Sequence, residues 1–99
     1  MGTPVHKTSL AETDLAEAIR YLLERDPGAA SKFVGEFEDL ARRLARFPEL
    51  YPRQRRSLAP EWKNVRMAVI RRFRYLVFYT HEDGTVVIRR LVHGARNEP

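Results

Sequence analysis

The sequence of 99 residues contains no cysteine, so disulfide bonds and thiolate metal sites are excluded and the fold must be held by packing alone. It also lacks any run approaching the ~18 apolar residues of a membrane span, and it does not begin with a basic region followed by an apolar stretch. We therefore expect a cytoplasmic protein with no membrane partner. The hydrophobic fraction of 43% is ordinary for a globular protein, and we expect a single domain over residues 1–99.

Familiar enzyme signatures are absent as well. There is no Gly-rich phosphate loop, no Gly-x-Ser-x-Gly, no His-Glu-x-x-His and no calcium loop. The three histidines, His6, His81 and His93, lie far apart without metal-ligand spacing. We expect no metal and no cofactor.

Positive charge is concentrated in the second half of the chain. Residues 1–48 contain seven Lys or Arg against eight acidic residues, whereas residues 49–99 contain eleven against five. Such an excess is typical either of a solvated face or of a surface that binds a polyanion or an acidic protein.

Two helices are predicted in the first half, after a short strand over residues 5–8. Ser9 and Glu12 have the spacing of a capping box, which predicts a first helix over residues 10–25. Asp26 is expected to cap a second helix that begins at Pro27. The turn between them is so short that the helices must form an antiparallel hairpin.

The second helix carries an apolar stripe at helical spacing and ends at Phe47-Pro48. The stripe consists of Ala30, Phe33, Val34, Phe37, Leu40, Ala41 and Leu44. In its last turns Arg42 and Arg43 follow Glu38 and Asp39 by four residues, the spacing of helical ion pairs.

The second half has the alternation and composition of strands. After an irregular connection over residues 48–64, branched and aromatic residues predict strands over 65–70, 74–80 and 85–92. Asp83-Gly84 indicates a two-residue hairpin, and Arg71-Arg72 marks the preceding reversal. The predicted fold class is α+β with the order β-α-α-β-β-β, in which the helical hairpin packs on a small twisted, mainly antiparallel sheet.

Basic and aromatic residues near this sheet form the candidate functional surface. They are Lys63, Arg66, Arg74, Tyr79, Arg89, His93 and Arg96. Strand alternation separates Arg66 from Met67, and we expect a basic stripe on the uncovered face and strand ends. Alternatively, one or two arginines, Arg74 or Arg90, are structural residues with packed stems.

The second half also resembles a known family. The run Arg74-Tyr75-Leu76-Val77-Phe78-Tyr79, followed by a hairpin and by His93-Gly94-Ala95-Arg96, resembles the ParE branch of the RelE/ParE toxin superfamily. The resemblance extends to Pro27-Gly28-Ala29-Ala30, to Phe47-Pro48-Glu49-Leu50-Tyr51-Pro52 and to Arg66. It covers nearly the whole chain and agrees with the predicted element order.

The resemblance implies the toxin of a type II toxin-antitoxin system with a cognate antitoxin as partner. ParE-like members poison DNA gyrase, whereas RelE-like members cut messenger RNA on the ribosome. For the ribonuclease alternative, Arg66, Arg74 and Arg96 would clamp the phosphate and His93 would act as acid or base. The chain departs from that pattern, because Lys63 is its last lysine and only three residues follow Arg96.

We therefore expect a gyrase poison without a catalytic centre. Its target-binding residues would be Arg66, Arg74, Arg89, His93 and Arg96, and Arg42 and Arg43 would meet acidic residues of the antitoxin. The alternative for His93 is a structural role, in which it fixes the end of the last strand by hydrogen bonds. A third possibility is a non-toxic basic module that binds nucleic acid.

Overall fold

The computed structural model describes residues 2–54 and 64–94, and its elements follow the expected order β-α-α-β-β-β. The bounds are β1 Val5–Lys7, α1 Ser9–Arg25, α2 Pro27–Arg46, β2 Arg66–Ile70, β3 Tyr75–Glu82 and β4 Thr85–His93, with the 3₁₀ turn η1 at Arg71–Phe73. The predicted α+β class is confirmed. Lys63 and Arg96, both candidates from the sequence, lie outside the described residues.

Helix α1 begins at Ser9 because its cap is Thr8. The Thr8 hydroxyl accepts a hydrogen bond from the Ala11 N–H at 3.0 Å and donates one to the carbonyl of Arg89 at 3.1 Å. Ser9 is the first helical residue, so the expected capping box of Ser9 and Glu12 is wrong. One threonine thus caps α1 and ties it to β4.

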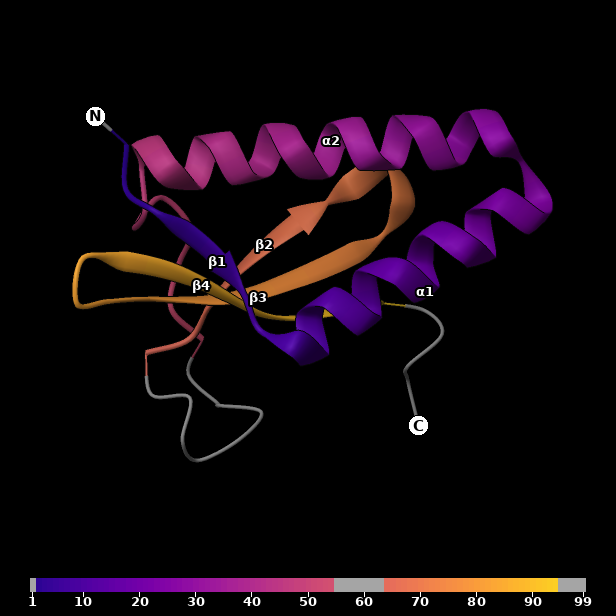
Figure 1. Ribbon diagram of the computed structural model, residues 1–99. Helices are drawn as coiled ribbons and strands as arrows, with labels where there is room; N and C mark the ends of the chain where they lie inside the picture. The colour runs from indigo at the N-terminus through magenta and orange to yellow at the C-terminus, as the bar shows by residue number, and fades with distance from the viewer. Residues whose placement is uncertain (1, 55–63, 95–99) are drawn as a thin grey trace.

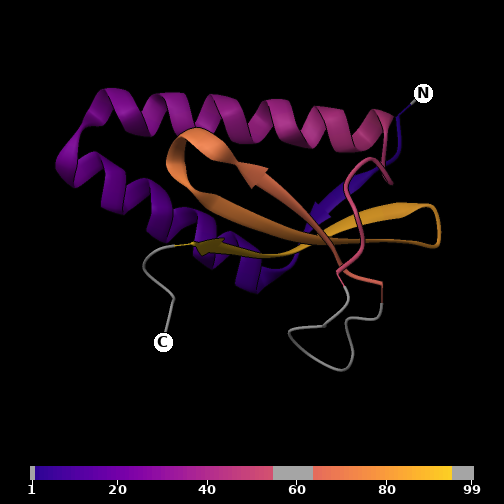
Figure 2. The ribbon, with the colours of Figure 1, turned by 180° about the vertical axis from the view of Figure 1, so that it is seen from behind.

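Helix α2 begins as expected, since the Asp26 carboxylate accepts from the Gly28 N–H at 3.0 Å and Pro27 occupies the first turn. Figure 1 shows α1 and α2 as the arms of a V that meet at this turn. Seen from behind in Figure 2, the reversal between β2 and β3 lies between the arms. Five residues of the predicted stripe are buried, namely Ala30, Phe33, Phe37, Leu40 and Leu44.

The sheet has the order β1-β4-β3-β2, with β1 parallel to β4 and the other pairs antiparallel. The expected mainly antiparallel sheet is therefore confirmed. The register between β3 and β4 shifts between Phe78 and Tyr79, which makes Arg89 the extra residue of a β-bulge. The bulge resets the alternation of β4, so that Ile88 and Leu91 both face the core.

The core lies between the helices and one face of the sheet. Phe33 of α2 contacts two aromatic rings, Phe73 at 5.4 Å and Tyr75 at 5.0 Å between ring centroids. Alternation along β2 and β3 places Ala68, Ile70, Tyr75, Val77 and Tyr79 on this face.

Two reversals in the sheet use left-handed backbone. Asp83 and Gly84, with φ of 53° and 71°, form the hairpin predicted from the sequence. Arg74 follows η1 with φ 60° and ψ 32°, so β3 begins at Tyr75, one residue later than expected. For a residue with a long side chain, the left-handed conformation costs roughly 1–2 kcal/mol.

The two hydrogen bonds of the Thr8 hydroxyl lead to a prediction about stability. Thr8→Ala should lower the free energy of unfolding by about 1–2 kcal/mol, because the first turn of α1 loses its acceptor and the Arg89 carbonyl loses its donor. Ser9→Ala is the matched control and should change it by less than about 0.5 kcal/mol. Urea unfolding followed by circular dichroism measures both, and a larger loss for Ser9→Ala would contradict the assignment of the cap.

Candidate functional site

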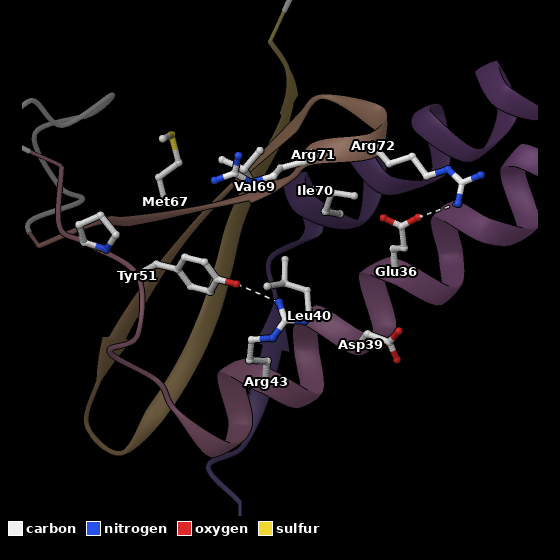
Figure 3. Close-up of a pocket in the computed structure, with 11 residues that line it drawn as sticks. Glu36, Asp39, Leu40, Arg43, Tyr51, Met67, Val69, Ile70, Arg71 and Arg72 are labelled. Atoms are coloured by element: carbon white, nitrogen blue, oxygen red, sulfur yellow. Dashed lines mark hydrogen bonds and ion pairs between the residues drawn. The ribbon is translucent and has the colours of Figure 1, made fainter.

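An open groove of about 640 Å³ runs between α2 and β2, and we term it the edge groove. Its apolar lining combines Leu40 of α2 with Met67, Val69 and Ile70 of β2. Figure 3 shows Leu40 and Ile70 between the helix and the strand, whereas Met67 and Val69 extend from the other side of β2. Val69 is 38% exposed although it is a strand valine, so the groove presents apolar surface to solvent.

The rim of the edge groove is charged. The Arg43 guanidinium donates to the Tyr51 hydroxyl at 2.9 Å, and Arg72 lies 3.9 Å from the Glu36 carboxylate (Figure 3). Asp39, which the helical spacing would pair with Arg43, instead forms its ion pair with Arg42. Arg43 is therefore free of a carboxylate partner among the described residues.

The strand beside the groove, β2, is an edge strand of the sheet. On its outer side the Gln54 N–H donates to the Val65 carbonyl at 2.8 Å, and the Met67 N–H donates to the Pro52 carbonyl at 3.3 Å. Alternation then places the backbone N–H and C=O of Val69 on the same outer side. No strand among the described residues pairs with them, so this part of the edge is open to another chain.

Arg66 has a different position from the one expected. It shares the helix-facing side of β2 with Ala68, and its side chain is only 16% exposed. Its guanidinium donates to the carbonyls of Glu49 at 3.2 Å and Tyr51 at 2.8 Å. Arg66 thus fixes the segment that leaves α2, and its expected place in a basic stripe on the uncovered face is wrong.

Glu49 completes this Arg66 cluster together with His81. The His81 ring nitrogen Nδ1 lies 2.9 Å from a carboxylate oxygen of Glu49, and Arg66 lies 3.7 Å from the other oxygen. The hydrogen bond with His81, followed by the charges of Arg66, His81 and Arg53, lowers the pKa of Glu49 below its ordinary value of 4.5. Nothing in the sequence pairs Glu49 with His81, since 32 residues separate them.

The Tyr79 hydroxyl lies beneath this cluster. The side chain is fully buried, and its hydroxyl has no hydrogen-bond partner of good geometry among the described residues. Burial raises the pKa of the Tyr79 phenol, and the nearby Tyr51 carbonyl offsets part of that rise. Tyr79 is thus a core residue, not part of a functional surface.

At the opposite end of the sheet the structure brings Arg74 and His93 together. Tyr75 pairs with His93, and the Gly94 N–H donates to the Arg74 carbonyl at 2.8 Å. A Cβ atom at Gly94 would lie 3.4 Å from that carbonyl oxygen, an ordinary van der Waals contact. The His93 ring packs edge-on against Tyr75 with 5.0 Å between centroids.

The two remaining sheet arginines have partners within the chain. Arg89 donates to the Thr80 hydroxyl at 3.2 Å on the side of the sheet away from the helices. Arg90 donates to the Asp14 carboxylate of α1 at 2.7 Å, and Asp14 also accepts the Leu91 N–H at 3.0 Å. The structural alternative is therefore correct for Arg90.

The described members of the predicted target-binding set do not lie at one end of the sheet. Arg66 of β2 pairs with Tyr79 of β3, whereas His93 pairs with Tyr75, four residues earlier in β3. At ~3.3 Å per residue, about 13 Å of sheet separates the two pairs, and Arg74 lies one residue further away.

No three His, Asp or Glu side chains in residues 2–54 and 64–94 come close enough to hold a metal ion. Neither helix in the same ranges is long and apolar enough to cross a membrane.

The lowered pKa of Glu49 predicts a pH dependence. The unfolded chain binds a proton at Glu49 more readily than the folded chain, so this contribution to stability is present above about pH 4.5 and is lost as the pH falls through the lower folded value. Glu49→Gln removes the contribution. In urea unfolding, wild type should exceed the variant in stability near pH 6, and the two should converge near about pH 2. A constant difference across this range would contradict the linkage.

Comparisons with known proteins agree with this architecture. The family model of the ParE toxin of type II toxin-antitoxin systems, parDE, matches residues 5–98. The solved structure of a chromosomal ParDE toxin-antitoxin system from P. aeruginosa matches with a TM-score of 0.74 and 17% sequence identity, over 92% of this chain and 95% of that chain. At this identity the likeness shows the fold. No curated protein matches the chain in sequence.

Proposed function

The chain belongs to the ParE toxin family of type II toxin-antitoxin systems, and we propose that it poisons DNA gyrase in the bacterial cytoplasm until a cognate antitoxin neutralises it. The observation that carries the proposal is the match of the family model to residues 5–98, together with the β-α-α-β-β-β order. The toxin would block replication by binding its target.

The placement of the candidate residues supports a binding surface over a ribonuclease centre. Cleavage of RNA needs an acid, a base and a phosphate clamp around one phosphodiester. Arg66 is instead bound to two backbone carbonyls, about 13 Å along the sheet from His93 and further from Arg74. His93 packs against the Tyr75 ring at the end of its strand.

The proposed target-binding surface is the end of the sheet that carries Arg74 and His93. Arg74 is exposed, and its backbone is fixed by the hydrogen bond from Gly94. Arg96, which follows His93 by three residues in the sequence and lies outside the described residues, stays a proposed target-binding residue. Arg89, the remaining residue proposed for target binding, is tied to Thr80 on the outer face and lies four residues before His93 in β4.

Purified protein should inhibit supercoiling by gyrase and leave messenger RNA intact on translating ribosomes. His93→Gln keeps hydrogen bonding but cannot titrate, so it should reduce gyrase inhibition by less than about tenfold, whereas an acid-base residue would cost roughly 10²- to 10⁴-fold. Supercoiling assays and primer extension on a translating extract measure the two activities.

A second test is expression in bacterial cells. Induction of the toxin should arrest growth, and co-expression of the cognate antitoxin should restore it. Codon-positioned cuts that disappear with His93→Gln would overturn the gyrase proposal in favour of a RelE-like ribonuclease.

We further propose that the edge groove receives the antitoxin. The apolar lining and the open edge at Val69 suit an amphipathic segment with apolar anchors. Arg43 on the rim, which has no carboxylate partner in the described part of the chain, suits acidic side chains of that segment. Arg42 is tied to Asp39, so of the two residues expected to meet the antitoxin, Arg43 is the better placed.

Val69→Glu should raise the Kd for the antitoxin at least about tenfold, because an apolar contact of roughly 1.5–3 kcal/mol is replaced by a charge. Leu23→Glu is the matched control, since Leu23 is 51% exposed on α1 and is not among the residues that line the groove. Arg43→Gln should mainly slow association and weaken its salt dependence. Surface plasmon resonance separates the rates, and equal losses for Val69→Glu and Leu23→Glu would contradict the location.

A further inference from the structure

The reversal between β2 and β3 carries three exposed arginines, Arg71, Arg72 and Arg74, which we term the arginine turn. Among the described residues, Arg71 and Arg74 form no ion pair. Arg72 lies 3.9 Å from the Glu36 carboxylate, and its guanidinium lies 5.8 Å from the centroid of the Phe73 ring. Elsewhere in the sheet Arg66, Arg89 and Arg90 are bound to groups of the chain itself. The arginine turn is therefore a local excess of unneutralised charge.

The backbone of the arginine turn is fixed. Phe73, within the turn, packs edge-on against the buried ring of Phe33 with 5.4 Å between centroids. The Arg74 N–H donates to the Arg71 carbonyl at 3.2 Å, and the Arg74 carbonyl accepts the Gly94 N–H at 2.8 Å. The charged side chains thus extend from a rigid base, which lowers the entropy lost when they bind a ligand.

Arg74 occupies a backbone conformation that favours other residues. The described non-glycine residues with positive φ are Asn64, Arg74 and Asp83, and the short polar side chains of Asn and Asp tolerate this region well. Arginine has no such advantage, and its guanidinium makes no hydrogen bond to the described residues that would offset the strain. Strain without an internal gain is typical of residues kept for function.

We propose that the arginine turn binds the phosphate backbone of double-stranded DNA. A guanidinium meets a phosphate with two parallel hydrogen bonds, and three of them within four residues can contact neighbouring phosphates. In Figure 3 Arg71 and Arg72 extend in different directions from the turn, with Arg72 toward Glu36. Such a spread suits a phosphate backbone better than a single small anion.

Duplex DNA is favoured over single-stranded nucleic acid because the turn lacks a stacking platform. Single-strand binders stack bases on exposed aromatic side chains, whereas Phe73, the aromatic residue of this turn, is packed against Phe33. This DNA contact goes beyond the proposed gyrase inhibition and does not depend on gyrase being the target. Arg71 and Arg72 also line the edge groove, so the contact belongs to the toxin without its antitoxin.

Fluorescence anisotropy with a short labelled duplex and the purified chain tests the proposal between about 50 and 200 mM salt. Each phosphate contact contributes about 0.9 to the slope of log K against log salt, so Arg71→Gln with Arg72→Gln should reduce the slope by about 1.8. The control pair is Arg20→Gln with Arg46→Gln, which removes the same charge from exposed helix positions. The control should reduce the slope by less than half as much.

Arg74→Gly separates the DNA contact from folding. It removes one guanidinium and relieves the left-handed strain, so the unfolding temperature should stay the same or rise while the salt slope falls by about 0.9. Equal effects of the turn pair and the control pair would reduce the proposal to net charge and overturn it. Polyglutamate that competes as well as DNA at equal charge would identify an acidic protein site instead, and tighter binding of single-stranded RNA would overturn the choice of duplex.

Discussion

The packing of the apolar stripe of α2 on one face of the sheet is the interaction on which the remaining arrangement depends. It buries Phe33 against Phe73 and Tyr75, and so fixes the reversal between β2 and β3 as well as the helix. Because β2 is an edge strand and α2 passes beside it, the same packing leaves the edge groove open to solvent. The surface offered to a partner is thus a consequence of how the core is covered.

The sequence was sufficient for the fold where a signal was local and periodic. The stripe of α2 repeats at helical spacing, the strands alternate, and Asp83-Gly84 has its own turn chemistry, so order and class could be predicted. The cap of α1 could not, because Thr8 and Ser9 are both good caps and the choice depends on the Arg89 carbonyl, 81 residues away. Local preference does not distinguish Thr8 from Ser9 as the cap, and the tertiary contact with Arg89 determines which of them is used.

The candidate site was less predictable than the fold. Alternation correctly separated Arg66 from Met67, but it does not say which face is covered. One usable sign was missed. Arg66 precedes Ala68 by two residues and Ile70 by four, so it lies on the same side of the strand as these two core residues. The pairing of Glu49 with His81 could not be predicted from the sequence, because it is a side-chain contact between the irregular segment after α2 and strand β3.

The position of β1 has a consequence for the order of events during synthesis. This first strand pairs in parallel with β4, Val5 opposite Val86, so the segment made first finds its neighbour only when the last strand has emerged. Contacts of such separation delay folding relative to local ones, and at about 5–20 residues per second the chain spends several seconds incomplete. A nascent copy therefore cannot complete its sheet on the ribosome until β4 has left the exit tunnel.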